Sequence, residues 1–167
     1  MTSDKMTIRK AVKDDLPHIF EIYARARKFM AENGNTVQWQ NNHPPKERLE
    51  KDIEEKLLYV YENDGEIQGV FAMIPGVDTT YNYIEGTWLD DSEYAAIHRV
   101  ASAGKEKRVF TNIADYCKYQ IPHLRIDTHE LNLPMQRAVE KNGFQKCGII
   151  YIADGSPRIA YEYVAEK

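Results

Sequence analysis

Asp127 and His129 stand two residues apart at the end of a run, His123 to Thr128, that is typical of a short β-strand. Alternate side chains of a strand point to the same face, so both are expected on one side of a sheet. An imidazole changes its charge near neutral pH, and a neighbouring carboxylate can orient or charge it. The pair therefore predicts a candidate general base. The alternative is a structural histidine that is hydrogen-bonded to the next helix.

The charge and the cysteine content exclude several classes of protein. The formal net charge is −4, which argues against a nucleic-acid partner, although Lys105, Lys107 and Arg108 form one local basic patch. No apolar run approaches the ~20 residues of a membrane helix, so no membrane partner is expected. Cys117 and Cys147 are too few and too far apart for a disulfide scaffold or a metal site, and they favour a reducing, cytoplasmic compartment.

The periodicity of the chain predicts the elements that must position these residues. Its 167 residues, 43% of them hydrophobic, can fill a core and predict one domain over residues 1–167. Strands are predicted over 6–11, 57–62, 67–74, 94–102, 123–128, 144–152 and 158–164. Helices are predicted to begin near residues 14, 44, 108 and 132. Segment 75–93 is expected to form a loop or a short β excursion beside a site. This order implies a mixed sheet covered by helices.

Two segments resemble the GNAT superfamily of N-acetyltransferases. The first is Ile97 to Phe110; the second joins Asp127-Thr128-His129 to Asn132-Leu133-Pro134-Met135 and ends at Gly143-Phe144. With the element order, the resemblance covers nearly the whole chain, and the Asp-Thr-His…Asn-x-Pro-Met run is similar to a bacterial subgroup. The resemblance implies an α/β (α+β) fold with a mixed, mostly antiparallel central sheet and helices on both faces. It also implies acetyl-CoA as co-substrate, and a homodimer is common in that family.

The resemblance further implies where coenzyme A binds. In the family, a loop of the form Gln/Arg-x-x-Gly-x-Gly/Ala presents backbone N–H groups at a helix start to the pyrophosphate. Here Lys105 takes the first of these places, and Arg108 and Phe110 stand where small residues belong. Cations could compensate for the missing small residues; the alternative is a solvated basic helix start. The expected contacts are Val100, Ser102, Lys105, Lys107, Arg108, Val109, Phe110 and the helix cap Asn132.

Transfer of an acetyl group to an amine sets further requirements. An aliphatic amine is protonated at neutral pH, so a base or a water relay must remove a proton before attack. The oxyanion needs N–H donors, expected by analogy from the backbone between His98 and Ser102. Besides His129, the candidate bases are Glu85, whose alternative is a solvated carboxylate, and His98, whose alternative is a packed histidine. The acceptor pocket is expected to include Trp39, Tyr81, Tyr83 and Trp88, unless these aromatic residues belong to the core or to an interface.

Three functions compete at this point. The first is an acetyltransferase that acts on a small-molecule or peptide amine by direct attack in a ternary complex. The second is a catalytically degenerate coenzyme A-binding or regulatory module. It is favoured by Arg108, by Phe110, and by Val139, which stands where the family often has a tyrosine acid. The third is an interaction domain that keeps the fold alone.

Overall fold

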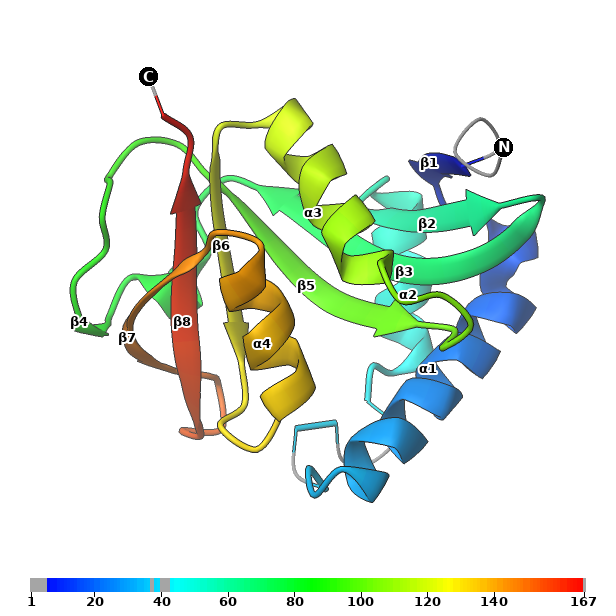
Figure 1. The fold of residues 1–167 in the computed structure, drawn as a ribbon, viewed down its shortest axis with the longest axis horizontal. Coiled ribbons are helices and arrows are strands. Elements are labelled where there is room, and N and C mark those ends of the chain that lie inside the picture. Colours follow the sequence, from blue (N-terminus) through cyan, green and yellow to red (C-terminus); the bar gives the residue numbers. More distant parts are fainter. Residues whose placement is uncertain (1–5, 37, 40–42, 167) are drawn as a thin grey trace.

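A computed structural model describes residues 6–36, 38–39 and 43–166 (Figure 1). Strands of this part form one 8-stranded sheet in the order β1-β2-β3-β5-β6-β8-β7-β4. They are β1 (Met6–Lys10), β2 (Leu58–Asn63), β3 (Glu66–Pro75), β4 (Glu85–Gly86), β5 (Ala95–Ser102), β6 (His123–Thr128), β7 (Gln145–Tyr151) and β8 (Pro157–Val164). The helices are α1 (Leu16–Glu32), α2 (Lys46–Glu54), α3 (Val109–Gln120) and α4 (Leu133–Lys141), with 3-10 turns η2 (Lys13–Asp15) and η3 (Thr79–Tyr81).

These elements confirm the order expected from the sequence. The predicted helices and long strands are all present, and η3 with the two-residue β4 occupies the segment that was expected to be a loop or a short β excursion. The turn between β2 and β3 places Asp64 and Gly65 at positive φ, 55° and 80°, as a tight hairpin requires. Every neighbouring pair of strands is antiparallel except β5 and β6, so the sheet is mixed and mostly antiparallel.

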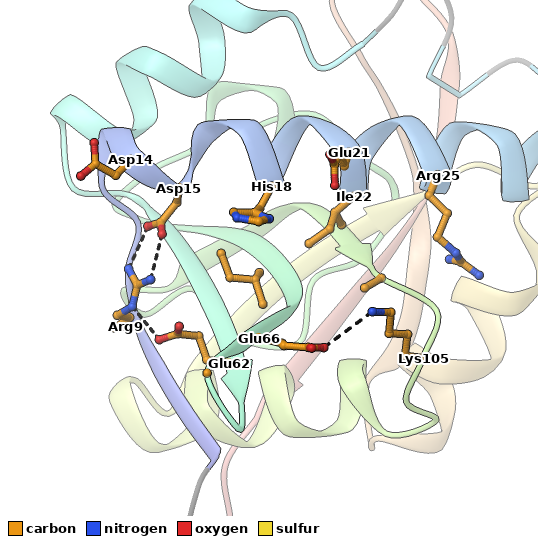
Figure 2. Close-up of a pocket in the computed structure, with 13 residues that line it drawn as sticks. Arg9, Asp14, Asp15, His18, Glu21, Ile22, Arg25, Glu62, Glu66 and Lys105 are labelled. Carbon is orange, nitrogen blue, oxygen red and sulfur yellow. Dashed lines mark hydrogen bonds and ion pairs between the residues drawn. The ribbon is translucent and has the colours of Figure 1, made fainter.

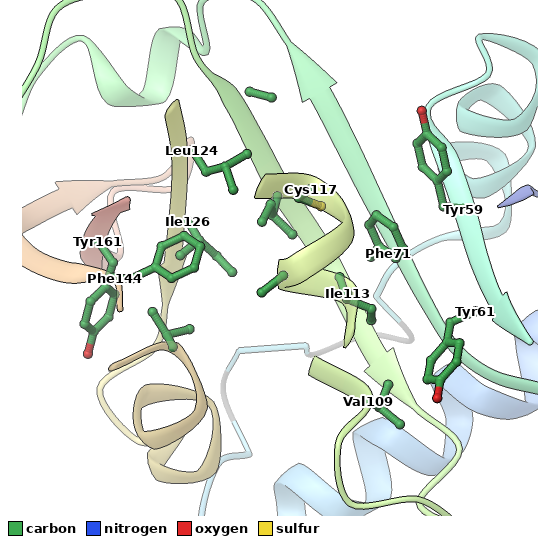
Figure 3. Packing of buried hydrophobic residues seen from close by; sticks show 14 of the residues in the cluster. Tyr59, Tyr61, Phe71, Val109, Ile113, Cys117, Leu124, Ile126, Phe144 and Tyr161 are labelled. Atoms are coloured by element: carbon green, nitrogen blue, oxygen red, sulfur yellow. The ribbon is translucent and has the colours of Figure 1, made fainter. Parts of the chain in front are cut away.

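The helices cover both faces of the sheet (Figure 1). Alternate residues of β2 point to opposite faces: Leu58 and Val60 pack with α1 and α2, whereas Tyr59 and Tyr61 pack with α3 and α4. Figure 3 shows Ile113 and Cys117 of α3 facing the sheet. Cys117 is fully buried, and burial raises the pKa of its thiol to about 12. Cys117 therefore belongs to the core.

The parallel strands β5 and β6 separate along their length. They pair only at Ala95 with Leu124, Ala96 with Arg125, and Ile97 with Ile126. On its other side β5 stays paired with β3 as far as Ser102, with an irregularity beside Arg99, whose φ is +55°. The hydroxyl of Tyr23 in α1 donates to the Arg99 carbonyl at 2.6 Å and holds the irregularity in place. From His98 to Ser102, therefore, the β6-facing edge of β5 has no strand partner in the described chain.

Candidate functional site

A cleft of about 700 Å³ opens where β5 and β6 separate. Its walls come from the α1–α2 connection, the diverging strands, the start of α4 and the β7–β8 turn. Four residues expected in the site line it: Trp39, His98, Val100 and Asn132. The topology thus brings residues together that lie far apart in the chain.

His98 forms an acid–base pair in this cleft. Its Nε2 lies 2.8 Å from the Oδ2 atom of Asp78, which precedes η3. This contact lowers the pKa of the Asp78 carboxyl below its ordinary value, so the carboxylate is ionised and accepts the hydrogen bond. Within the described residues no group hydrogen-bonds to Nδ1. A carboxylate therefore orients the ring, and the opposite nitrogen is free to accept a proton.

Tyr81 packs beside the His98 ring, with ring centroids 6.1 Å apart. Its hydroxyl donates to Oδ2 of Asp127 at 2.6 Å, and burial raises its pKa well above the ordinary value. Asp127 lies one position beyond the last β5–β6 pair, next to His98 in register. Asp78 is thus held by His98, and Asp127 by Tyr81, at the point where β5 and β6 separate.

The predicted pairing of Asp127 with His129 is wrong. Asp127 accepts from Tyr81, while Nδ1 of the buried His129 accepts the backbone N–H of Leu131 at 3.0 Å. Burial lowers the pKa of His129, and nearby Arg158 lowers it further. The chain turns after Thr128, so the two-residue alternation of a strand no longer applies to His129. The ring has a structural role, as the alternative proposed, but its partner Leu131 lies in the turn before α4 and not in the helix.

The start of α4 and the end of β6 each contribute one polar residue to the cleft. Asn132 caps the helix, because its Oδ1 accepts from the Met135 N–H at 3.2 Å, and its Nδ2 donates to Gln38 Oε1 at 3.0 Å. The hydroxyl of Thr128, a residue 1% exposed, also lines the cleft but has no hydrogen-bond partner among the described residues. A buried hydroxyl without a partner is costly, so this end of the cleft suits a ligand with amide groups.

The β5–α3 loop has the free donors of an anion site. Arg108 occupies the N-cap position of α3, and no described side chain caps the helix, which leaves the first-turn N–H groups available. Both oxygens of Glu106 are bound, to the Tyr61 hydroxyl and to the Asn63 amide, each at 2.7 Å. Lys107 and Arg108 are exposed and have no ion-pair partner in the described structure.

Phe110 does not crowd this loop. The half-buried ring packs against the core, with its centroid 6.3 Å from that of Phe144, and Val109 is buried as well. At the start of α3, Val109 and Phe110 therefore present only their backbone N–H groups to the loop. The Oγ atom of Ser102 accepts the N–H of Gly104, whose φ is +82°. Ser102 and Gly104 therefore shape the loop, and the bulk expected from Phe110 is directed away from it.

A second cavity, of about 630 Å³, lies between α1 and the first three strands (Figure 2). Arg9 is paired there with Asp15 and Glu62 at 2.8 and 2.7 Å. Lys105 points to Glu66 in this cavity, 3.6 Å away. The three-cation site that the sequence predicted is therefore divided, because Lys105 pairs on the α1 side while Lys107 and Arg108 stay at the start of α3.

Three other expected residues do not line the cleft. Glu85 in the edge strand β4 accepts from the exposed Tyr151 hydroxyl at 2.7 Å. Tyr83 is 62% exposed. Trp88 stacks on the guanidinium of Arg125, 4.0 Å from its ring centroid, and its Nε1 donates to the Tyr81 carbonyl. The short β excursion puts Glu85 in the edge strand β4, whereas Trp88 packs over Arg125 of β6 as part of a buried cluster.

The sequence analysis missed Asp78 and Arg158. Asp78 lies in a polar loop 20 residues before its partner His98, and nothing in the local pattern joins them. Arg158 had a usable signal. It alternates with Ala160 and Glu162, while Ile159 and Tyr161 point to the opposite face, so the pattern puts a charged residue on one face of a strand whose other face is apolar. Arg158 lines the cleft and Asp78 adjoins it through His98, and only the tertiary structure brings them there.

No group of three His, Cys, Asp or Glu side chains in the described chain is placed to hold a metal ion. None of its helices has the length and apolar character needed to cross a membrane.

Comparison with known proteins identifies the fold and the family. No protein-family model and no curated protein sequence matches the chain. Among solved structures, a GNAT-family acetyltransferase from Streptococcus agalactiae 2603 is 31% identical with a TM-score of 0.87, over 97% of this chain and 96% of the other. GNAT-family acetyltransferases from Listeria monocytogenes 4b F2365 and Bacillus cereus ATCC 10987 share the fold. Their identities are 17% and 18% and their TM-scores 0.68 and 0.61, over 95% and 97% of this chain and 94% and 99% of theirs.

The streptococcal structure shares the fold and nearly a third of the residues over almost the full length of both chains. The uncapped start of α3 and the capped start of α4 are local features that the resemblance implied. Together these findings show that the chain belongs to the GNAT family of acetyltransferases.

Proposed function

We propose that the chain transfers an acetyl group from acetyl-CoA to a primary amine by direct attack in a ternary complex, with His98 as the general base. The observation that supports this most is the Asp78–His98 pair at the point where β5 and β6 separate. One ring nitrogen is held by a carboxylate, and the other has no partner among the described residues. This arrangement suits a group that takes a proton from an amine and is stabilised once charged.

The residues of the cleft and of the β5–α3 loop fit coenzyme A. The N–H groups in the first turn of α3, with Lys107 and Arg108, would hold the pyrophosphate. Asn132 and the unpartnered Thr128 hydroxyl would bind the amides of the pantetheine arm. When bound, acetyl-CoA supplies the activated acyl group. We also propose that the chain belongs to the bacterial subgroup that its Asp-Thr-His…Asn-x-Pro-Met run resembles.

Two steps remain, stabilisation of the oxyanion and protonation of the thiolate, and β5 and solvent would carry them out. Backbone N–H groups on the unpaired edge between His98 and Ser102 would donate to the acyl oxygen as negative charge develops there. Val139, where the family often has a tyrosine, is fully buried in the core and offers no proton. Water in the open cleft would therefore protonate the departing thiolate.

The test measures two quantities, free-thiol release with a panel of amines and the melting temperature with acetyl-CoA. His98→Gln should lower kcat/KM by roughly 10²–10⁴-fold while acetyl-CoA still raises the melting temperature. The matched control is His18→Gln, because His18 is exposed on α1 outside the cleft. Undiminished turnover in His98→Gln would place the base elsewhere. Stabilisation by acetyl-CoA without turnover of any amine would favour the degenerate coenzyme A-binding module.

A further inference from the structure

Arg158 is a buried cation that forms no ion pair with a carboxylate of the described residues. The residue is 6% exposed and lines the cleft. Its guanidinium makes one hydrogen bond in the described structure, from Nη1 to its neighbour's carbonyl, Pro157 O, at 2.8 Å, and no described carboxylate lies within ion-pair distance. Burial lowers its pKa, although an arginine stays charged at any physiological pH. Buried arginines are normally paired, so this one is poised for an anionic partner.

Arg158 lies on the acceptor side of the sheet. In β8 the residues Ile159 and Tyr161 face α3 and α4, where the α3 loop is expected to hold the cofactor. Arg158 and Ala160 alternate with them and point to the opposite face. His98 is on that face too, beside Tyr81, which packs with Ala160. Arg158 and the proposed base therefore share one face, opposite the helix that would bind pyrophosphate.

Two carboxylates, Asp127 and Asp154, act on the charge of Arg158 from a distance and raise its pKa, but neither forms an ion pair with it in the described structure. Asp127 accepts from Tyr81, and the exposed Asp154 accepts from the Ser156 N–H at 2.8 Å. Arg99 has its own buried partner, Asp52, at 2.8 Å. An incoming anion would be the close partner that the guanidinium lacks. A planar carboxylate matches the fork of a guanidinium with two parallel hydrogen bonds.

We propose that the acceptor is an amine that also has a carboxylate, a molecule of the amino acid class, and that Arg158 binds this carboxylate while the amine lies at His98. The proposal rests on the proposed acetyltransferase function. It makes Arg158 the residue that selects the acceptor, since an amide or amine without the negative charge leaves the buried guanidinium unpaired.

The experiment compares matched acceptors: amino acids, their carboxamides, their decarboxylated amines and their phosphonate analogues. The parent should acetylate the carboxylates with kcat/KM at least ~30-fold above the carboxamides. Arg158→Gln should lower kcat/KM for the carboxylates by about 100-fold, mainly through KM, and leave the carboxamides nearly unchanged. Arg158→Lys should keep part of the preference. The control is Arg137→Gln, which removes an exposed charge of α4 outside the cleft.

Calorimetric binding of the same compounds without acetyl-CoA separates this proposal from the proposed function. If no amine is acetylated, but carboxylates bind to the parent and not to Arg158→Gln, the carboxylate site stands and the acetyltransferase proposal fails. Arg158→Gln should melt no lower than the parent, because the guanidinium it removes has no buried ion-pair partner. Equal use of carboxylate and carboxamide, an unchanged preference in Arg158→Gln, a preference for phosphonates, or no binding at all would each overturn the assignment.

Discussion

Nε2 of His98 in β5 lies 2.8 Å from Oδ2 of Asp78, a residue of the turn before η3, so that the irregular segment between β3 and β5 holds the imidazole at the cleft. The carboxylate also accepts the Thr80 N–H at 3.0 Å through Oδ1. Asp78 is therefore a positioning residue with both oxygens engaged, and its side chain is anchored independently of His98.

Asp78→Asn should lower kcat/KM about 10–100-fold, because the amide neither orients nor stabilises a charged imidazole as the carboxylate does. The acidic limb of the pH–rate profile should move to lower pH, since the protonated ring loses its negative partner. The measurement is the profile of kcat/KM between pH 5 and 9. Asp91→Asn, at an exposed position, is the control. If Asp78 had only a structural role, Asp78→Asn would lower kcat/KM without moving the acidic limb of the profile.

Arg108→Ala should weaken acetyl-CoA binding, whereas Lys105→Ala should have little effect, because Lys105 already pairs with Glu66 on the α1 side. Exposed charge interactions are screened over about 8 Å at physiological ionic strength, so the loss in Arg108→Ala should shrink at high salt. Isothermal titration at two salt concentrations measures both effects. Equal losses in the two variants would show that Lys105 leaves Glu66 and joins the cofactor site.

Asn132→Ala should destabilise the fold by about 1–2 kcal/mol, because it removes the cap of α4 and the hydrogen bond to Gln38. The affinity for acetyl-CoA should fall as well. Asn132→Asp keeps the cap acceptor but loses the amide donor, so it should recover much of the stability. Urea unfolding and titration calorimetry test the two effects separately. A stability loss with unchanged affinity would make Asn132 a cap only.

Asp15→Asn should destabilise the fold at pH 7 by about 1–2 kcal/mol, since Arg9 donates to both Asp15 oxygens, at 2.8 and 2.9 Å. The hydrogen bond from Arg9 lowers the pKa of Asp15 below its ordinary value of 3.8 in the folded state. Its stabilisation is therefore complete above pH ~4 and is lost as the pH falls through the folded pKa. The difference between the parent and Asp15→Asn should shrink near pH 3.

The matched control for this prediction is Asp14→Asn, because Asp14 is exposed and neighbours Asp15. Chemical unfolding at pH 7, 5 and 3 gives the free energy of unfolding of each protein. A difference between the parent and Asp15→Asn that stays constant over this range would show that Arg9 does not lower the folded pKa of Asp15.

The secondary structure and the fold class could be predicted because they depend on local patterns. The Asn63-Asp64-Gly65 turn, the alternation in β2 and the cap at Asn132 each follow from a few neighbouring residues. The burial of Cys117 follows from helical spacing. These features need no knowledge of what packs against them, so the sequence alone determined the elements, their order and the mixed sheet.

The site was decided by tertiary structure. Asp78 meets His98 because the segment before η3 folds back over β5, and Arg158 enters the cleft because β8 lies next to β6 in the sheet. Conversely, His129 does not pair with Asp127 as expected, because the chain turns after Thr128 and the alternation of the strand ends there. Local spacing indicates which residues share a strand face. Only the pairing of distant strands decides which charges meet, and it leaves Arg158 buried without an ion pair among the described residues.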